Sequence, residues 1–403
     1  MIRSLYSGVS GLQAHGTAID VVADNIANVN TPGFKAARAQ FQALVAQTLR
    51  AAGTPDAGGQ NPAQVGLGVT VGAIERQMTQ GSPQSTGRAS DLSIEGNGYF
   101  IVTDGGGAPR YTRNGAFDIN GNRQLVEAAT GASVLGWVAD ANGKVDSSQP
   151  TTALIIPAEG DSLARQTTKL TLSGNLNATA AVGESASTTV RLYDSQGREQ
   201  NITFSMVKTA ANTWSWEAKD AGGASVGTGT LDFDGAGRCT TAPATVSVPL
   251  SEGATTPMVF TTTFDVQQLA EGSEVVASYQ DGLPPGAFQG FSVTDSGILI
   301  GSYSNGLTRQ IGQLAIASFT NPAGLQRGPS GSFMETANSG PAQVGTSGTG
   351  GRGTIVSGTL EMSNVDLTRE FSSLIVYQRG FQANGRSVTV SDQLLQDILM
   401  LKQ

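Results

Sequence analysis

The residue types that usually carry catalysis are scarce in this chain. His15 is the only histidine among 403 residues, and Cys239 is the only cysteine. These counts exclude a disulfide within the chain, a metal site made of histidine or cysteine clusters, and a proton relay that needs two histidines. We expect His15 on the surface or between helices, and Cys239 as a spectator thiol in a turn-rich segment. The sequence therefore predicts neither a cofactor nor a metal ion.

Carboxylates offer a second route to chemistry. Asp91 with Glu95, or Asp118 with another acid, could supply the two carboxyl groups that hydrolyse a glycosidic bond. Aspartates in such turn-forming sequences more often cap turns. The run from Asp232 to Gly237 begins like a calcium-binding loop, but the acidic residue at position 12 of that motif is missing. We interpret these segments as turns, and the protein is not expected to be an enzyme.

Two further patterns could bind ligands. The glycines at 105–107 are not followed by the Lys-Ser/Thr pair of a phosphate-binding loop. Trp214 and Trp216 are two residues apart, on one face of a predicted strand, and could stack on a sugar. Packing on a strand face is the commoner use of such rings. The tryptophans leave one alternative function open, a β-rich surface adhesin or glycan-binding protein.

The composition favours a turn-rich β protein with a polar surface. Charged residues make up 14% of the chain, the net charge is −8 at pH 7, and 53 residues are glycine. The negative balance argues against nucleic acid as a partner. No stretch approaches the roughly 18 apolar residues of a membrane-spanning helix, so no membrane insertion is expected. The first residues lack the apolar core of a secretory signal, so we expect export without a cleaved signal peptide.

Apolar residues recur every seven positions at both ends of the chain, which is its strongest pattern. The N-terminal row is Leu5, Leu12, Ile19 and Ile26. The C-terminal row is Leu367, Leu374, Phe381, Val388 and Leu395. Such rows place an apolar seam along one side of a long helix. Neither helix can bury its seam alone, so we expect pairing between the ends, with other copies of the chain, or both. We favour self-assembly over a helix pair that caps a monomer.

Between the ends, the apolar period changes from seven to two. Strand-like alternation begins at Val65 and continues, with turn signals, through most of the chain to the second helix. Residues 35–50 predict a second short helix, with apolar positions such as Phe41. Residues 51–64 and 340–353 read as loops.

This order of elements predicts an α+β multidomain chain with a nested topology. The long terminal helices would pair in a coiled-coil-like domain, and β-rich domains resembling barrels or sandwiches would be inserted between them. The expected parts are a helical terminal domain (1–30 and 364–403), connecting segments (31–68 and 325–363), a middle β domain (69–145 and 284–324, which could extend to residue 360) and a distal insertion (146–283).

Both ends of the chain resemble the bacterial flagellar rod and hook family. The N-terminal match runs from Asp24 to Lys35, and the C-terminal match covers 363–367 and 377–384. The stretches 87–100 and 111–117 are similar to the middle β domain of that family. The positions carried over from the motifs are Asn25, Asn28, Thr31, Gly33, Phe34, Asn364, Val365, Gln378 and Arg379.

The length of the chain and its large insertion favour a hook-type member of this family. Rod members of the family are generally shorter and lack such an insertion. A distal rod-type member is the alternative, because residues 1–12 look somewhat rod-like. The resemblance implies a flexible helical tube of many copies, a homo-oligomer that acts as a universal joint, passes torque from rod to filament and leaves a central export channel. It also implies an extracellular place in the flagellum, export by the flagellar type III apparatus, and contacts with the distal rod, hook cap and hook–filament junction proteins.

Overall fold

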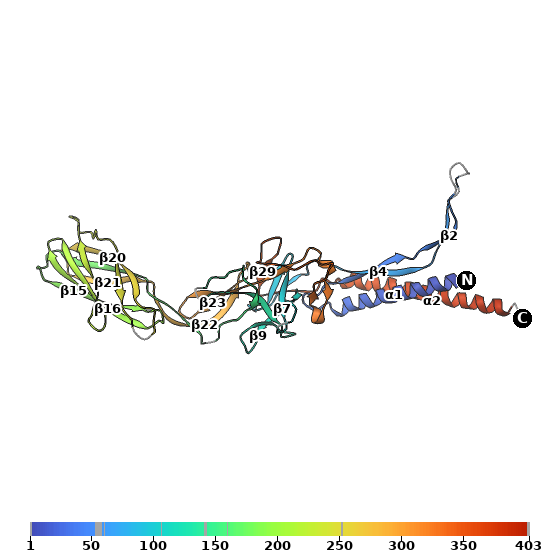
Figure 1. Ribbon diagram of the computed structural model, residues 1–403, viewed down its shortest axis with the longest axis horizontal. Coiled ribbons are helices and arrows are strands. Elements are labelled where there is room, and N and C mark those ends of the chain that lie inside the picture. The colour runs from blue at the N-terminus through green and yellow to red at the C-terminus, as the bar shows by residue number, and fades with distance from the viewer. Residues whose placement is uncertain are drawn as a thin grey trace. The chain divides into compact units, whose positions relative to one another are not determined.

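The structure is a computed structural model that describes residues 2–52, 59, 61–105, 107–140, 143–158, 160–250 and 253–400. The chain divides into two compact units. Unit 1 comprises Met1–Ile156, Phe291–Ile300 and Gln310–Gln403, and unit 2 comprises Pro157–Gly290 and Gly301–Arg309. Figure 1 labels the elements along the chain.

Unit 1 contains both long helices, as the heptad rows predicted. They are α1 (Ile2–Ala27) and α2 (Leu367–Met400). The start of α2 is capped by Asp366, whose Oδ1 accepts the backbone N–H groups of Thr368 at 2.9 Å and Arg369 at 3.3 Å. Within the described residues, neither helix is long and apolar enough to cross a membrane.

The short helix expected over residues 35–50 is wrong, because this segment forms two strands. They are β1 (Ala37–Ala43), paired with β4 (Val69–Arg76), and β2 (Ala46–Arg50), paired with β3 (Ala63–Gly66). Its composition suits a helix, but tertiary contacts decide the outcome. The Asn25 side chain bonds both the N–H and the C=O of Ala37, which leaves the chain extended there. The loop expected over 51–64 lies partly outside the described residues, and β3 begins within it.

The rest of unit 1 is a β body built from short strands. The strands are β5 (Pro83–Ser85), β6 (Leu92–Glu95), β7 (Tyr99–Thr103), β8 (Arg110–Thr112), β9 (Phe117–Ile119), β10 (Leu125–Glu127), β11 (Ser133–Val138), β12 (Thr152–Ala153), β25 (Ile316–Ser318), β26 (Gln326–Arg327), β27 (Phe333–Met334), β28 (Gln343–Gly345), β29 (Thr354–Ser357) and β30 (Thr359–Glu361). Two short 3₁₀ turns, η2 (Pro322–Gly324) and η3 (Pro329–Gly331), flank β26. Tyr99, Tyr111 and Phe319 meet edge to face in its core.

Segments far apart in the sequence pair in this body. β29 pairs with β6, and β30 pairs with β5, in both cases antiparallel. These pairs bring the residues just before α2 back to the residues that follow β4. Strand β28 lies within 340–353, which the sequence predicted as a loop.

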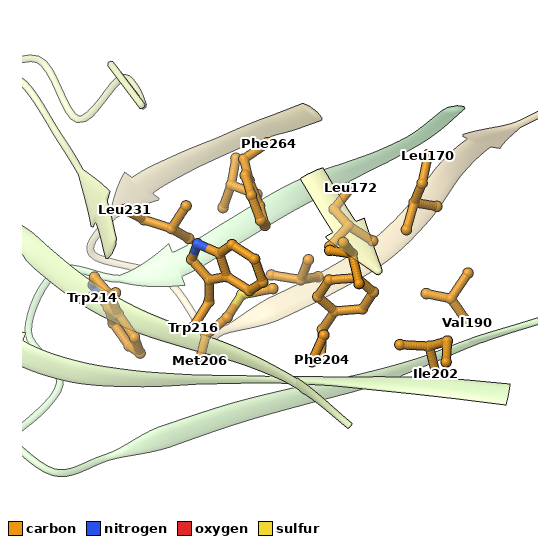
Figure 2. Packing of buried hydrophobic residues seen from close by; sticks show 14 of the residues in the cluster. Leu170, Leu172, Val190, Ile202, Phe204, Met206, Trp214, Trp216, Leu231 and Phe264 are labelled. Carbon is orange, nitrogen blue, oxygen red and sulfur yellow. The ribbon is translucent and has the colours of Figure 1, made fainter. Parts of the chain in front are cut away.

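Unit 2 consists of two four-stranded sheets that share one hydrophobic core. Their orders are β19-β20-β14-β21 and β15-β16-β17-β18. The strands are β14 (Lys169–Asn177), β15 (Ser185–Tyr193), β16 (Glu199–Ala210), β17 (Thr213–Lys219), β18 (Ser225–Asp232), β19 (Ala244–Val248), β20 (Met258–Leu269) and β21 (Glu274–Gln280). Buried and exposed residues alternate along the whole of β20. Figure 2 shows side chains of both sheets meeting in the core.

Four more strands complete the description of the chain. They are β13 (Ser162–Arg165), which pairs with β22 (Leu283–Val293), and then β23 (Ile298–Tyr303) and β24 (Thr308–Leu314). Neither four-stranded sheet of the described residues closes on itself, since each ends in two edge strands. The barrel alternative in our fold prediction is therefore wrong.

Asp-x-x-Gly-x turns connect many of these strands. In one, Asp234 Oδ1 accepts the N–H of Ala236 at 2.9 Å and of Arg238 at 2.8 Å, and Gly237 takes a φ of +77°. These N–H groups hold the pKa of Asp234 below its usual range. The segment that resembles a calcium loop is therefore a hairpin turn, as predicted.

Candidate assembly site at the paired terminal helices

The two terminal helices run antiparallel and side by side, which Figure 1 also shows. The hydroxyls of Ser4 and Ser391 lie 3.2 Å apart near one end of the pair. At the other end, Asn25 Nδ2 donates to Glu370 Oε2 at 3.1 Å. The ends of the chain therefore pair with each other, which was one of the two arrangements that the heptad rows allowed.

Small and polar residues form the contact between the two helices. A Cβ atom added to Gly8 would lie 2.9 Å from Val388 Cγ2, and one added to Gly11 would lie 2.7 Å from the Asn384 side chain. The row of α1 that faces α2 is Ser4, Gly8, Gly11, His15, Ala18, Val22 and Asn25. Glycine at these points lets the two backbones approach closely.

His15 lies between the helices, in accordance with the sequence-based expectation. Its ring centroid is 5.2 Å from that of Phe41 on β1 and 6.1 Å from that of Tyr377 on α2. A Cβ atom on Gly380 would lie 2.7 Å from His15 Cε1, so the imidazole packs directly on the α2 backbone. This aromatic cluster joins α1, β1 and α2.

Apart from Val388, which packs against Gly8, the predicted heptad residues lie beside this contact rather than at its centre. On α1, all four are half-buried. On α2, Leu374, Val388 and Leu395 are half-buried, whereas Leu367 is 40% exposed and Phe381 is 43% exposed.

A large apolar surface of α2 therefore remains uncovered in a single chain. Its exposed apolar side chains are Leu367, Phe371, Ile375, Val376, Phe381, Val390, Leu394, Ile398, Leu399 and Met400. Extended exposed apolar surfaces on soluble proteins commonly mark sites of protein–protein interaction. The helix pair thus uses small residues internally and leaves large apolar ones facing outward.

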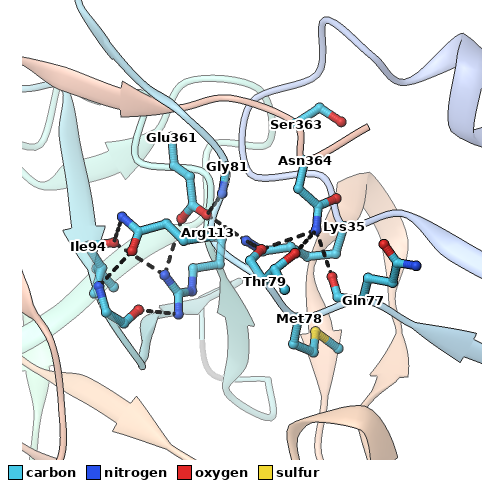
Figure 3. A network of polar contacts seen from close by, with 12 residues as sticks. Lys35, Gln77, Met78, Thr79, Gly81, Ile94, Arg113, Glu361, Ser363 and Asn364 are labelled. Carbon is cyan, nitrogen blue, oxygen red and sulfur yellow. Dashed lines mark hydrogen bonds and ion pairs between the residues drawn. The ribbon is translucent and has the colours of Figure 1, made fainter. Parts of the chain in front are cut away.

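A buried ion cluster lies where the helices join the β body (Figure 3). Glu361 Oε1 is 2.5 Å from Lys35 Nζ, and Glu361 Oε2 is 3.2 Å from Arg113 Nη1. The three side chains are 1%, 1% and 5% exposed. Glu361 Oε1 also accepts the N–H of Gly81 at 2.9 Å, and Arg113 donates to the carbonyls of Ile94 and Gly96. Four separate stretches of the chain are tied together here.

Burial governs the electrostatics of this cluster. Removal from water lowers the pKa of Lys35, the negative charge and hydrogen bond of Glu361 oppose that shift, and the positive charge of Arg113 adds to it. One carboxylate thus serves two buried cations, so Glu361 is the member whose loss the site tolerates least.

Two asparagines of the family motifs hold the chain that enters β1. Asn25 bonds both backbone groups of Ala37, at 2.7 and 2.9 Å. Asn364 accepts the N–H of Ala36 at 2.8 Å and donates to the carbonyl of Gln77 at 2.8 Å. Both side-chain amides supply hydrogen bonds that a neighbouring strand does not provide to the backbone at these points.

Gly33 and Phe34 have specific structural roles. Gly33 has a φ of +71°, and a Cβ atom on it would lie 2.6 Å from the backbone nitrogen of Asn114. Only glycine fits both conditions. The Phe34 ring lies 5.2 Å from the guanidinium carbon of Arg327, which also pairs with Asp24 at 2.7 Å. Strand β26, which carries Arg327, is thereby fastened to α1.

The remaining motif residues are less central. Asn28 donates to Asp24 Oδ1 at 3.0 Å and accepts from Thr31 Oγ1 at 3.1 Å, which shapes the turn after α1. Val365 is half-buried before α2, and Gln378 and Arg379 are exposed on α2.

The sequence-based reasoning did not select Lys35, Arg113 or Glu361 as site residues. No local sequence pattern predicts that three charged residues, as many as 326 positions apart in the chain, will meet. The small-residue row of α1 was detectable, because its members recur at alternating spacings of four and three.

The residues first considered for chemistry do not form a site. Trp214 and Trp216 are 0% and 3% exposed and lie in the core of unit 2, where they cannot stack on a sugar (Figure 2). Asp91 is buried, and the exposed Asp118 is 3.9 Å from Arg88. Cys239 is partly buried in unit 2. The described part of the chain contains no group of three or more His, Cys, Asp or Glu side chains placed to hold a metal ion.

Family models match the chain in four segments. Residues 5–35 match "Flagella basal body rod protein", and residues 356–401 match "Flagellar basal body rod FlgEFG protein C-terminal". Residues 93–175 match "Flagellar hook protein FlgE/F/G D1 domain", and residues 163–283 match "Flagellar basal body protein FlaE D2 domain". The segments at the two ends contain the paired helices.

Similarity to a characterised relative extends over the full length. The flagellar hook protein FlgE of Borreliella burgdorferi is 40% identical over 442 aligned residues, with 100% of both chains covered. The chain belongs to the flagellar hook protein FlgE family. The FlgE of Treponema pallidum is 37% identical with 100% of both chains covered, and that of Escherichia coli is 32% identical with 98% covered.

The FlgE family consists of structural hook components and not of enzymes, which agrees with the scarcity of catalytic residues. Among solved structures, Helicobacter pylori FlgE2 matches with a TM-score of 0.47 at 15% identity. That match covers 69% of this chain and 100% of the other.

Proposed function

We propose that this chain is the repeating subunit of a flexible helical tube that passes torque from rod to filament and leaves a central export channel. The observation that carries the proposal is how small and large side chains are distributed over the terminal helices. The contact within one chain uses Gly8, Gly11 and Ala18, while large apolar side chains of α2 face outward. Those side chains become buried if other copies pack around the pair, which favours polymerisation.

The buried ion cluster is suited to a region of the protein that transmits force. Glu361, Lys35 and Arg113 join the base of the helices to strands of the β body without access for water. A rigid junction between an assembling helix pair and a β body would carry torque without unfolding. The asparagine contacts of Asn25 and Asn364 add further ties at the same level.

The domain organisation is part of the proposal. We infer a helical terminal domain (1–30 and 364–403), connecting segments (31–68 and 325–363), a middle β domain (69–145 and 284–324) and a distal insertion (146–283). The two sheets of unit 2 share one core, which supports a β-sandwich for the insertion.

Location and partners follow from the same proposal. We infer a place outside the cell, export through the flagellar type III apparatus without a cleaved signal peptide, and contacts with the distal rod, hook cap and hook–filament junction proteins. The heptad residues of both helices would pack between subunits of the tube.

Assembly of purified full-length chain, followed by negative-stain electron microscopy, tests the proposal. The test variant carries Val390→Gln, Leu394→Gln and Ile398→Gln, three side chains that are 53%, 47% and 46% exposed. Because each side chain is already about half buried, each substitution removes roughly 0.8 to 1.5 kcal/mol of burial on assembly. We expect the critical concentration for tubes to rise by roughly a hundredfold to a thousandfold, with the helical circular dichroism of the monomer unchanged.

The matched control replaces three exposed valines of unit 2. It carries Val182→Gln, Val259→Gln and Val276→Gln, at positions 71%, 46% and 49% exposed. Tubes should form as from the parent chain. If the α2 variant assembles as well as the parent, the helices are not the assembly surface and the proposal fails.

A further inference from the structure

A pocket of about 350 Å³ lies in the β body beside the buried ion cluster. Arg113 of the cluster forms part of its wall. No aspartate or glutamate is among the lining residues, all of which the structure describes. In a chain whose net charge is −8, this pocket therefore presents a positive group and no negative one.

The cluster behind this wall carries excess positive charge. Lys35 and Arg113 are both cations, and among the described residues Glu361 is the one carboxylate that pairs with them (Figure 3). One positive charge is thus left uncompensated. The Nε atom of Arg113 is also buried without a hydrogen-bond partner in the described part of the chain. Burial of a charge without a counter-charge is costly, so an anion in the pocket would stabilise the cluster.

A glycine-rich loop, residues 346–353, forms another part of the lining. Gly350 and Gly351 line the pocket and have φ angles of +57° and +78°. Within the described residues, the backbone N–H groups of Thr349, Gly350 and Gly351 donate no hydrogen bond. Successive free N–H groups in such turns form concavities that bind anions.

A second arginine and two amides add to the positive character of this site. Arg352 fixes the loop, because its Nε donates to the carbonyl of Thr346 at 3.0 Å and its Nη2 donates to Thr349 Oγ1 at 2.9 Å. It makes no ion pair with any residue that the structure describes. Asn97 and Gln343 line the pocket with exposed side-chain amides, which make no hydrogen bond within the described residues and can donate to a ligand.

We propose that this pocket binds a small free oxoanion, of the phosphate or sulfate type, between Arg113 and the N–H groups of Gly350 and Gly351. The ligand class follows from the groups present, which are N–H donors and cations without a lining carboxylate. Hydrogen bonds between such donors and an oxoanion are stronger than those between neutral groups. The loop leads into β29, which pairs with β6, so a bound anion would add a tie beside the ion cluster. The inference does not depend on the proposed polymerisation.

A phosphate titration of the full-length monomer, with chloride replaced at constant ionic strength, tests the site. An anion that binds only the folded chain slows hydrogen exchange through global unfolding by the factor 1 + [L]/Kd. We therefore expect β7 amides to exchange about tenfold more slowly at a phosphate concentration about ten times Kd. The amide resonances of Gly350 and Gly351 should shift along the same saturation curve. Those of Gly222 and Gly223, an exposed glycine pair in a turn of unit 2, should not move.

Gln343→Glu places a carboxylate in the pocket and provides the test variant. This carboxylate would repel phosphate and interact with Arg113 in its place, so we expect the Kd for phosphate to rise at least about tenfold. Gln84→Glu, on β5 and outside the pocket, is the matched control, because its side chain is also exposed. It should respond to phosphate as the parent chain does. Phosphate also stabilises folded proteins in general by its exclusion from their surfaces, and this effect cancels in the comparison.

Two results would overturn the inference. One is that the resonances of Gly350 and Gly351 do not move with phosphate. The other is an equal response of the Gln343→Glu variant and the parent chain. Neither result would affect the proposed assembly of the chain into tubes, which is measured separately by electron microscopy.

Discussion

At the scale of single residues, a few side chains decide how the helices meet the β body. Glu361 neutralises two buried cations, Asn25 and Asn364 hold the chain before β1, and Gly33 permits a backbone contact that no other residue allows. Glu361, Asn25 and Gly33 are buried and Asn364 is half-buried, so we expect these positions to tolerate little change.

Removal of the Glu361 charge tests the ion cluster. Glu361→Gln leaves Lys35 and Arg113 buried without an anion, so we expect a loss of about 3 to 5 kcal/mol in the free energy of unfolding of unit 1. Denaturant titration followed by hydrogen exchange of strands β6 and β7 measures it. Glu75→Gln removes an exposed ion pair with Arg38 at 3.9 Å, and should cost less than about 1 kcal/mol. Equal effects of the two substitutions would refute the special role of the cluster.

A bulky residue at Gly11 tests the close approach of the helices. Since even a Cβ atom there would lie 2.7 Å from the Asn384 side chain, Gly11→Val should destabilise the pair by about 1 to 3 kcal/mol. Gly16→Ala is the matched control, because the nearest atom to its Cβ would be 4.0 Å away. It should stabilise α1 by up to about 1 kcal/mol. Thermal melting followed at 222 nm distinguishes them, and a stabilising Gly11→Val would contradict close packing.

Tyr111 makes the stability of unit 1 sensitive to alkaline pH. Burial, followed by the negative charge of Glu335 and a hydrogen bond to it, raises the pKa of Tyr111 to about 12. The unfolded chain releases the Tyr111 proton near pH 10, whereas the folded chain keeps it up to about pH 12. The contribution of Tyr111 to stability is therefore complete below pH 10 and is lost between pH 10 and about 12. We expect the unfolding free energy to fall there by up to about 1.4 kcal/mol per pH unit.

Tyr111→Phe should remove that part of the pH dependence. Urea midpoints at pH 9, 10 and 11, measured for both proteins, provide the comparison. An unchanged slope in the variant would show that the tyrosine titrates alike in the folded and unfolded chains.

At the scale of elements, unit 1 contains parts of very different burial. β7 has four buried residues in succession, whereas every residue of β2 is exposed and β3 has none that is buried. A two-stranded hairpin without a packed face is marginal in water. Within one chain, the β2–β3 pair therefore depends on backbone hydrogen bonds and on exposed side-chain contacts such as that from Gln64 Nε2 to Thr48 Oγ1 at 3.2 Å.

Hydrogen exchange should reveal this difference directly. We expect amides of β2 and β3 in the monomer to exchange at rates close to those of an unfolded peptide, because local opening costs almost nothing there. Amides of β7 serve as the internal control and should be protected to the level of global unfolding. Strong protection of β2 in the monomer would contradict this account.

At the scale of the whole molecule, the two units have separate cores. The aromatic core around Tyr99 and Phe319 belongs to unit 1, and the core around Trp214 and Trp216 belongs to unit 2. Domains with their own cores commonly unfold as separate units.

A core substitution in unit 2 tests this independence. Trp216→Ala should cost unit 2 about 3 to 5 kcal/mol, because it leaves a large cavity against Phe204 and Phe264. The unfolding midpoint of unit 1, followed by exchange of β7, should not change. A parallel loss in both units would show a single cooperative core instead.

The sequence by itself determined the terminal helices, the β-rich middle and the absence of catalytic clusters. Heptad rows and two-residue alternation are local patterns, and local patterns are sufficient for such elements. Residues 35–50 failed as a helix because pairing with β4 and the amide of Asn25 outweighed their composition. Which helix face is buried was also decided in three dimensions, since close approach at Gly8 and Gly11 displaced the leucine row from the centre of the contact.

Only the tertiary structure brought Lys35, Arg113 and Glu361 together, because their meeting depends on strand pairs between segments far apart in the chain. It also decided which large apolar side chains of α2 stay exposed in one chain. A repeat in sequence records which residues share a face, but the antiparallel direction and rotation of the helices determine where that face points.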